Sequence, residues 1–383
     1  MNTSKANGYN KLLVFFLIAV LLIFAFGFVA DGWQLVQVPD EDNNGKTEDE
    51  SGNADENKDP TQDENGEGEN EPEIPEEPKE PEIYIPEYVD NLTGLETTEE
   101  LAKRRPVSFV MNSSSPLYSI SGASIIAEFP LENGDSRLLA FATDTDKLGK
   151  VGALSQTRGY ISNISKSFGS ILVSCGSDDR KDYESVDVAA SHFDLTKFTG
   201  YHYTEFQTYC YSNGDLIDAG IANANIGTAV NSRQLLPYVF NEFGAEAITG
   251  GANAKSVVIP YSADNVTELY YSEDIGGYAL VKNGAVKTDL LCDKSVTFEN
   301  AFILFADTVT YEGADGVEMI MSTIGCGTGY YVTEGTLMNI SWSVTSSGDM
   351  TFTSEEGERL VINRGSSYIG FFKSSRVDEI KIS

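Results

Sequence analysis

The side chains best suited to nucleophilic chemistry lie in the segment SILVSCGSDD, where an apolar run ends at Cys175 and Ser177. A serine nucleophile needs a base within reach, usually histidine, and the only two histidines, His192 and His202, lie outside any recognisable motif. Ser177 also lacks the flanking glycines of a G-x-S-x-G turn. The segment therefore predicts a buried strand that ends in a tight turn, with Gly176 supplying conformational freedom. Cys175 is predicted to be a small core residue.

Two arginines offer a different chemistry. Arg137 and Arg158 each lie beside an apolar segment, and a guanidinium presents a planar fork that matches a carboxylate or a phosphate. Glu128, at the end of the apolar run ASIIAE, could pair with either of them. Two interpretations stay open: a ligand site for an anion, or a structural ion pair between Glu128 and Arg137 across adjacent strands.

No metal or cofactor is predicted. The chain has no H-E-x-x-H motif and no Cys/His cluster, and its acidic segments SADN, SEDIGG and DTDK are shorter than a twelve-residue calcium loop. The four cysteines are 35, 82 and 34 positions apart, which matches no C-x-x-C pattern; they are Cys175, Cys210, Cys292 and Cys326. One or two disulfides are open in an oxidising compartment, but four separate small core residues are the favoured interpretation.

The acidic charge of the chain is concentrated before the folded part. The formal net charge is −33, and residues 40–90 carry 21 Asp and Glu against 3 Lys. That stretch has too few large apolar residues to offset the entropy of ordering it, so residues 31–90 are predicted to be a disordered tether. Pro recurs every few residues in its second half, which favours an extended spacer. Nucleic-acid binding is not expected, since the rest of the chain has no basic stripe.

Residues 12–30 form a stretch of 19 residues without a charge, LLVFFLIAVLLIFAFGFVA. A helix of that length spans about 28 Å, close to the hydrocarbon core of a bilayer. Lys5 and Lys11 precede it, so residues 1–11 are predicted to be cytoplasmic and the remainder extracytoplasmic. A cleaved signal peptide is the alternative, but the apolar run is long for one and Phe28 fits a cleavage site after Ala30 poorly.

The remainder of the chain predicts an α+β fold. Strand patterns over 107–112, 122–129, 136–143 and 169–176 alternate with helical patterns over 97–106 and 156–168, which indicates a partly parallel sheet. A third helix is predicted over 231–244, with a start or kink near Pro237. Short alternating strands follow to the end. We therefore expect an N-terminal mixed α/β domain at 91–249 and a C-terminal β-rich domain at 250–383.

Three stretches resemble the YerB-like family of bacterial surface proteins: NLTGLETTEELAKRRPVSFVM, the run GYALVKNG followed by Asp289, and GCGTGYYVTEGTLMNISW with GERLVINRGSSYI. The family consists of extracytoplasmic proteins of unassigned function, many of them lipoproteins. The resemblance implies an α/β region followed by a β-rich region. It also implies a shared cleft with polar positions that this chain keeps, which are Glu128, Arg137, Arg158, Tyr160 and Ser177.

Other polar positions of the family pattern are replaced here. Ser115 and Ser155 stand where the family tends to have Arg, Ser124 where it has Asp, and Ser174 and Ala224 where it has His. The resemblance thus implies a divergent member. We expect a non-catalytic ligand-binding or scaffold module, held at the cell envelope by residues 12–30, with a cell-wall or envelope-protein partner. The alternative is an envelope hydrolase acting on cell-wall material, in active or degenerate form.

Overall fold

The computed structural model describes residues 83–177, 185–205, 209–231, 235–313 and 316–383. The predicted cytoplasmic segment 1–11, the anchor 12–30 and most of the tether 31–90 lie outside these ranges. Within the described residues, no helix is both long and apolar enough to cross a membrane. All described residues belong to one compact unit, which extends from Pro78 to Ser383.

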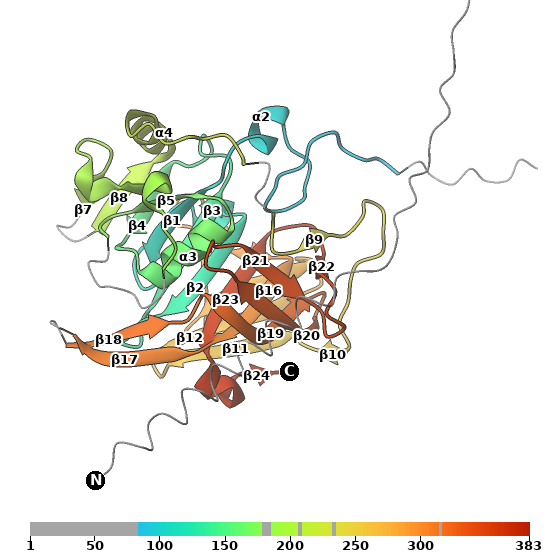
Figure 1. Cartoon of the computed structure of the whole chain (residues 1–383). Helices are drawn as coiled ribbons and strands as arrows, with labels where there is room; N and C mark the ends of the chain where they lie inside the picture. The colour runs from blue at the N-terminus through green and yellow to red at the C-terminus, as the bar shows by residue number, and fades with distance from the viewer. Residues whose placement is uncertain (1–82, 178–184, 206–208, 232–234, 314–315) are drawn as a thin grey trace, which may run out of the picture. The chain divides into compact units, whose positions relative to one another are not determined.

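A mixed sheet of 14 strands is the largest among the described residues (Figure 1). Its path runs β10 (Ala252–Asn253), β20 (Thr336–Val344), β19 (Gly325–Thr333), β16 (Asn300–Ala306), β23 (Ser367–Lys373), β2 (Ile125–Pro130), β3 (Ser136–Ala142), β1 (Val107–Asn112), β4 (Lys150–Leu154), β8 (Tyr209–Asn213) and β7 (Tyr203–Glu205). β21 (Met350–Thr353) pairs with β20, and β5 (Ile171–Ser174) lies between β1 and β6 (His192–Asp194). The pairs β1–β5, β5–β6, β2–β23 and β16–β23 are parallel. The expected partly parallel sheet is therefore present, and it continues through β2 and β23 into the C-terminal half.

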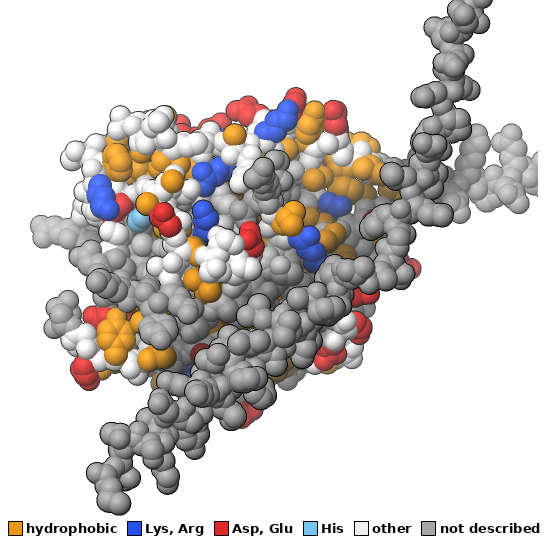
Figure 2. All heavy atoms as spheres, viewed as in Figure 1, with side chains coloured by type: hydrophobic (Ala, Val, Ile, Leu, Met, Phe, Trp, Pro, Cys, Tyr) orange, Lys and Arg blue, Asp and Glu red, His pale blue; other side chains and the backbone are white. Residues whose placement is uncertain are grey.

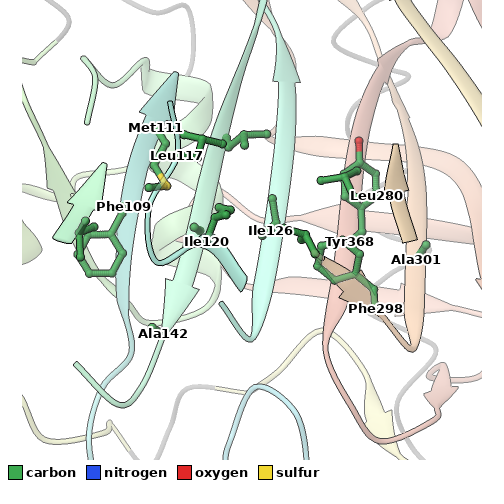
Figure 3. Close-up of a cluster of buried hydrophobic side chains, with 14 of the residues drawn as sticks. Phe109, Met111, Leu117, Ile120, Ile126, Ala142, Leu280, Phe298, Ala301 and Tyr368 are labelled. Atoms are coloured by element: carbon green, nitrogen blue, oxygen red, sulfur yellow. The ribbon is translucent and has the colours of Figure 1, made fainter. Parts of the chain in front are cut away.

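A second sheet covers one face of the first. It is antiparallel and contains β14 (Ala285–Val286), β13 (Gly277–Lys282), β12 (Asn265–Ser272), β11 (Ser256–Ser262), β24 (Lys381–Ile382) and β15 (Thr297–Phe298). Figure 3 shows side chains of the two sheets in one apolar cluster, with Ile126 and Tyr368 close to Leu280 and Phe298. Two small ribbons complete the strands: β17 (Thr308–Gly313) with β18 (Gly316–Met321), and β9 (Val239–Phe240) with β22 (Val361–Ile362).

The opposite face of the main sheet is covered by α3, Gly159–Ser167, the helix expected over 156–168. Its apolar residues Ile161 and Ile164 are fully buried in a second core cluster with Phe141 and Phe302. The helix expected over 97–106 is one turn, α2 (Glu99–Ala102), capped by the Thr98 side chain. Short 3-10 helices occur at Ile120–Gly122, Ala189–Ser191, Leu195–Lys197 and Ser374–Glu379.

The helix predicted over 231–244 is wrong for the described part of that range, residues 231 and 235–244. Strand β9 lies there, and the flanking backbone is irregular. Tyr238 is 2% exposed and stacks on Phe302, with ring centroids 5.8 Å apart and planes 5° apart. Tyr238 is therefore buried as a single aromatic residue and not as part of a helical face. Pro237, which precedes it, is unfavourable inside a helix.

The sequence patterns missed the helix α4, Gly214–Asn223. The side chain of Asn213 caps it by accepting a hydrogen bond from the Leu216 amide at 2.8 Å. Gly220 lies so close to Phe193 that a Cβ there would be 2.2 Å from the ring. The glycines that permit close packing also lower the helical propensity of the segment, so the sequence did not predict this helix.

Charged side chains on the face seen in Figure 2 are dispersed. Lys and Arg lie among acidic, apolar and uncharged groups, and they form no continuous stripe on this face of the described residues. Sites on the protein must therefore be sought in particular clefts and side-chain clusters.

Phe302 provides a test of the core on the α3 face. Its ring lies 4.8 Å from that of Phe352 and 5.1 Å from that of Tyr331, measured between centroids. Phe302→Ala should lower the free energy of unfolding by about 3 to 5 kcal/mol, because it leaves a cavity among these rings. Denaturant unfolding of the whole chain measures the loss. The control Val309→Ala, at a site that is 61% exposed on β17, should change it by less than about 0.5 kcal/mol; similar losses in the two variants would contradict this packing.

Candidate functional site

The five predicted site residues lie on two faces of the main sheet. In the antiparallel register of β2 and β3, Glu128 pairs with Leu138, whereas Phe129 pairs with Arg137. Because side chains alternate along a strand, Glu128 and Arg137 point to opposite faces. The ion pair considered between them is therefore not formed, and Glu128 pairs with Lys282 of β13 instead.

Glu128 is 1% exposed and both of its carboxylate oxygens are bound. Lys282 Nζ and Ser136 Oγ donate to Oε1. Thr267 Oγ1 donates to Oε2 at 2.9 Å and Tyr368 OH at 2.8 Å. These partners come from β3, β12, β13 and β23, and Glu128 itself lies on β2, so one buried carboxylate connects the two sheets.

The network keeps Glu128 ionised. Burial opposes the negative charge, but the Lys282 ammonium and the hydrogen bonds outweigh it and lower the pKa of the Glu128 carboxyl. Burial, together with the charge of Glu128, raises the pKa of Tyr368 and Tyr261 well above the usual value for a phenol. Glu128 is therefore a structural anion rather than a general acid, because at neutral pH it has no proton to donate.

The other four predicted residues lie on the α3 face. Arg137 Nη1 donates to the carbonyl oxygen of Gln156, and Gln156 Nε2 donates to the carbonyl oxygen of Ser177 at 2.6 Å. A chain of hydrogen bonds thus joins β3 to the turn after β5. Within this chain, the role of Ser177 is carried by its backbone.

Arg158 and Tyr160 stand at the start of α3. Arg158 forms an ion pair with Glu132, with 3.0 Å between Nη2 and Oε1, and its side chain is 10% exposed. Tyr160 is buried, and its hydroxyl donates to the carbonyl oxygen of Pro130 at 3.3 Å. Both side chains tie α3 to the turn between β2 and β3.

A serine–histidine pair that the sequence did not reveal lies at the end of β5. Ser174 Oγ and His192 Nε2 are 2.8 Å apart, because parallel pairing sets β6 beside β5. Ser174 is fully buried, and its Oγ also donates to the carbonyl oxygen of Gly176 at 2.8 Å. A hydroxyl has one proton, so His192 Nε2 must donate to Ser174 rather than accept from it. A general base needs the opposite arrangement.

Asp194 lies next to this pair, but its carboxylate accepts hydrogen bonds mainly from backbone amides. Its Oδ1 accepts from the amide of Gly176 at 2.9 Å and from the amide and hydroxyl of Thr196 at 3.1 and 2.8 Å. Burial lowers the pKa of His192 even though the Asp194 charge favours the imidazolium. The cluster therefore holds a neutral histidine and resembles a catalytic triad in composition, but not in its hydrogen bonding.

A cleft of about 450 Å³ lies elsewhere, where four segments meet: residues 90–101, 119–124, 143–148 and 289–294. We call it the hydroxyl cleft, because six of its lining residues are Ser or Thr: Thr93, Thr97, Ser119, Ser121, Ser124 and Thr143. Its volume is within the range typical of small-molecule sites. None of the five predicted site residues lines it.

Asp289 holds the cleft together. Its carboxylate is 1% exposed and accepts from the Ser119 amide at 2.9 Å, the Leu291 amide at 2.8 Å, and the amide and hydroxyl of Ser121 at 3.0 and 2.8 Å. One aspartate thus fixes the segment before β2 against the segment after β14. It is also the Asp that follows the family-like run GYALVKNG, so the sequence contained a signal for this position, but not its partner.

Thr143 lines the hydroxyl cleft and has a hydroxyl without a hydrogen-bond partner among the described residues. The residue follows β3, is 4% exposed, and its Oγ1 is buried without a hydrogen-bond partner in the described structure. A buried hydroxyl left unpaired costs about 1 to 3 kcal/mol, so such groups are rare. Because Oγ1 is shielded from solvent, a molecule in the cleft would reach it only after a small movement of the cleft wall.

The lining of the cleft is acidic, with four carboxylates, Asp90, Glu96, Asp144 and Asp289, against two lysines, Lys147 and Lys294. Asp144 pairs with Lys147 at 2.9 Å, and Asp90 accepts from the Thr93 hydroxyl at 3.0 Å. Among the described residues, no three His, Cys, Asp or Glu side chains come close enough to hold a metal ion. The lining is therefore unfavourable for an anionic ligand and compatible with a neutral polar one.

Comparison with known proteins gives a consistent result across the folded part. Residues 92–227 match the model of the N-terminal domain of the protein of unknown function DUF3048, and residues 257–369 match its C-terminal domain. "Putative lipoprotein YerB" of Bacillus subtilis (strain 168) is 26% identical over 226 residues, which cover 56% of this chain and 66% of that protein. The crystal structure of YerB from Bacillus subtilis matches with a TM-score of 0.64 at 22% identity, covering 77% of this chain and 99% of the YerB chain.

Replacement of Lys282 tests the buried ion pair. Lys282→Met leaves Glu128 buried without its cation, so the free energy of unfolding should fall by about 3 to 5 kcal/mol. Lys255→Met is the matched control, since Lys255 forms an exposed pair with Glu273 and should change stability by less than about 1 kcal/mol. Urea unfolding of the two variants and the parent measures both effects. Equal stability of the two variants would show that the pair is not needed.

The depressed pKa of Glu128 predicts a pH dependence. The ionised carboxyl stabilises the folded state above its ordinary pKa of 4.5, and this stabilisation is lost as the pH falls through the lower pKa of the folded protein. The stability difference between the parent and Glu128→Gln should thus be largest near neutral pH and should shrink below pH 4.5. Unfolding curves recorded from pH 7 to pH 3 measure it. Glu273→Gln, at an exposed glutamate, should give a difference that stays flat over the same range.

Proposed function

This chain belongs to the YerB-like (DUF3048) family, and we propose that it is a membrane-anchored extracytoplasmic module that binds a ligand without converting it. The uncharged stretch 12–30 would be the anchor, residues 1–11 would face the cytoplasm, and the acidic residues 31–90 would be the spacer. The relative YerB bears the name of a lipoprotein, which supports attachment to the outer surface of a membrane.

The unpartnered hydroxyl of Thr143 in the hydroxyl cleft is the observation that carries the proposal. Ser and Thr hydroxyls both donate and accept, so a wall rich in them suits a ligand whose own groups do both. Leu95 and Leu291, each 49% exposed, give the wall apolar patches that fit the faces of a ring. These features favour a polyhydroxylated ligand of the saccharide class, such as a fragment of envelope glycan.

Binding without catalysis is supported by the hydrogen bonding and the charge of the polar groups. The lining of the hydroxyl cleft contains no histidine. Outside it, His192 donates to Ser174, and Glu128 is held as an anion by Lys282. The site predicted on the α3 face, with Arg137, Arg158, Tyr160 and Ser177, remains an alternative ligand site, now without Glu128 beside it. The envelope hydrolase remains the alternative activity.

The test uses the whole chain in detergent, with soluble glycan fragments of the cell wall as the probe. Titration calorimetry should show binding that Thr143→Val weakens by roughly 5- to 30-fold, because the hydroxyl loses one hydrogen bond to the ligand. The same variant should be as stable as the parent or more stable, since valine has the shape of threonine and removes an unpaired buried hydroxyl. A gain of stability with a loss of affinity separates a ligand-binding role from a structural one.

Thr145→Val is the matched control. Thr145 is fully buried two residues further along, and its hydroxyl donates to Asp218 at 2.7 Å outside the cleft. This variant should lose stability and keep its affinity. Arg158→Ala tests the α3 face. Loss of affinity in this variant, with the affinity of Thr143→Val unchanged, would indicate that the ligand binds at the arginines instead. Cleavage of the glycan during the titration would favour the hydrolase.

Cys292 gives a local readout of occupancy, because it is exposed and lines the hydroxyl cleft. Bound ligand should slow its alkylation by iodoacetamide, measured by peptide mass spectrometry. Cys326, exposed on β19 and outside the cleft, should react at an unchanged rate. Equal protection of both thiols, or of neither, would contradict binding in this cleft.

A further inference from the structure

Two of the four cysteines lie together in the core. Cys210 of β8 is 6% exposed and belongs to the apolar cluster beneath the second sheet, and Cys175, directly after β5, packs against the same cluster. Cys292 and Cys326 are exposed and lie on other segments. The sequence separates Cys175 and Cys210 by 35 positions, so only the fold brings them together.

Strand β4 sets the distance between the two cysteines. Leu154, the last residue of β4, pairs with Cys210 in the antiparallel register of β4 and β8. The next residue, Ser155, accepts a hydrogen bond from the Cys175 amide at 3.0 Å. Adjacent strands are about 5 Å apart, so each cysteine lies next to one of two consecutive residues at the end of β4, and both pack against the same apolar cluster.

The two thiols also interact directly. A side-chain hydrogen bond between them lowers the pKa of Cys175, against the effect of its partial burial. The same bond, together with burial and the charge of Cys175, raises the pKa of Cys210. The pair is thus asymmetric: the half-buried Cys175 loses its proton more readily than the buried Cys210. A thiol with a lowered pKa next to a second thiol is the arrangement that disulfide exchange needs.

We propose that Cys175 and Cys210 form an intramolecular disulfide in the extracytoplasmic protein. The Cys175 thiolate attacks one sulfur of an external disulfide, either a small molecule or a thiol–disulfide oxidoreductase, and releases the first donor thiol. The Cys210 thiol then loses its proton, attacks the mixed disulfide at Cys175 and releases the second donor thiol. Two cysteine thiols are oxidised, the donor disulfide is reduced to two thiols, and the two cysteine protons end on the donor.

The bond would fix the turn at residues 175–177 to β8. That turn receives the hydrogen bond from Gln156, which in turn binds Arg137, and its Gly176 amide is held by Asp194. The disulfide would therefore stabilise the α3-face residues and close a loop that contains β6 and β7. The disulfide does not touch the hydroxyl cleft, so this proposal does not depend on the proposed ligand.

Thiol counting on the whole chain tests the proposal. After treatment with oxidised dithiothreitol, a cyclic disulfide that leaves no stable mixed disulfide on single thiols, and removal of the reagent, the denatured protein should take up two iodoacetamide groups, at Cys292 and Cys326, and four after reduction. Non-reducing peptide mapping should find the peptides of Cys175 and Cys210 linked. Reduction should lower the melting temperature by roughly 4 to 16 °C, the range expected for a disulfide of this kind in a domain of this size.

Variants keep the test decisive. Cys175→Ser, at the half-buried position, should leave three thiols open to alkylation without reduction, and reduction should no longer change its melting temperature. The double variant Cys292→Ser/Cys326→Ser should keep the linked peptides and the melting shift of the parent. Uptake of four groups by the oxidised parent, or a linkage that involves Cys292 or Cys326, would overturn the proposal.

Discussion

The buried pair of Glu128 and Lys282 is the interaction on which the arrangement of the two sheets depends. A carboxylate that is 1% exposed can stay ionised only when a cation and hydrogen bonds replace its water. Here the cation comes from β13, and the hydrogen bonds come from β3, β12 and β23. Apolar contact between the sheets would allow them to slide, because the hydrophobic effect is non-directional. The ion pair admits one register, since any shift would leave the charge without a partner.

That register also builds the hydroxyl cleft. Strand β3 leads from Ser136, a partner of Glu128, to Thr143 in the cleft wall, and the chain beyond β13 and β14 leads from Lys282 to Asp289. The ion pair and the Asp289 contacts with Ser119 and Ser121 thus hold two regions at two points. A cleft wall supported in this way is held in place before binding, which would reduce the entropy lost on binding of the proposed ligand.

Local patterns predicted the strands at 107–112 and 136–143 and the helix at 156–168, because their periodicity matches their packing. They failed at 231–244, where the core holds Tyr238 as a single aromatic residue, and at α4, where packing against Phe193 requires Gly220. The sequence indicated individual site positions such as Glu128 and Asp289, but it did not indicate which residues bind them. Lys282 lies 154 positions from Glu128, and Ser119 lies 170 from Asp289. Only the register of β2 and β3 decides that Glu128 and Arg137 face apart, and a one-residue shift would reverse it.

The parallel pairing of β2 with β23 has a consequence for how such a chain reaches its folded state. Strand β2 lies near the start of the folded part, and Tyr368 of β23 follows Glu128 of β2 by 240 positions. In a chain delivered across a membrane N-terminus first, β2 has an unpaired edge until β23 has emerged. An open edge strand invites pairing with other chains, and contacts distant in sequence form slowly. Export of the kind proposed would therefore pass through an intermediate that is prone to aggregation, and a strongly acidic segment ahead of it would keep neighbouring copies apart by charge repulsion.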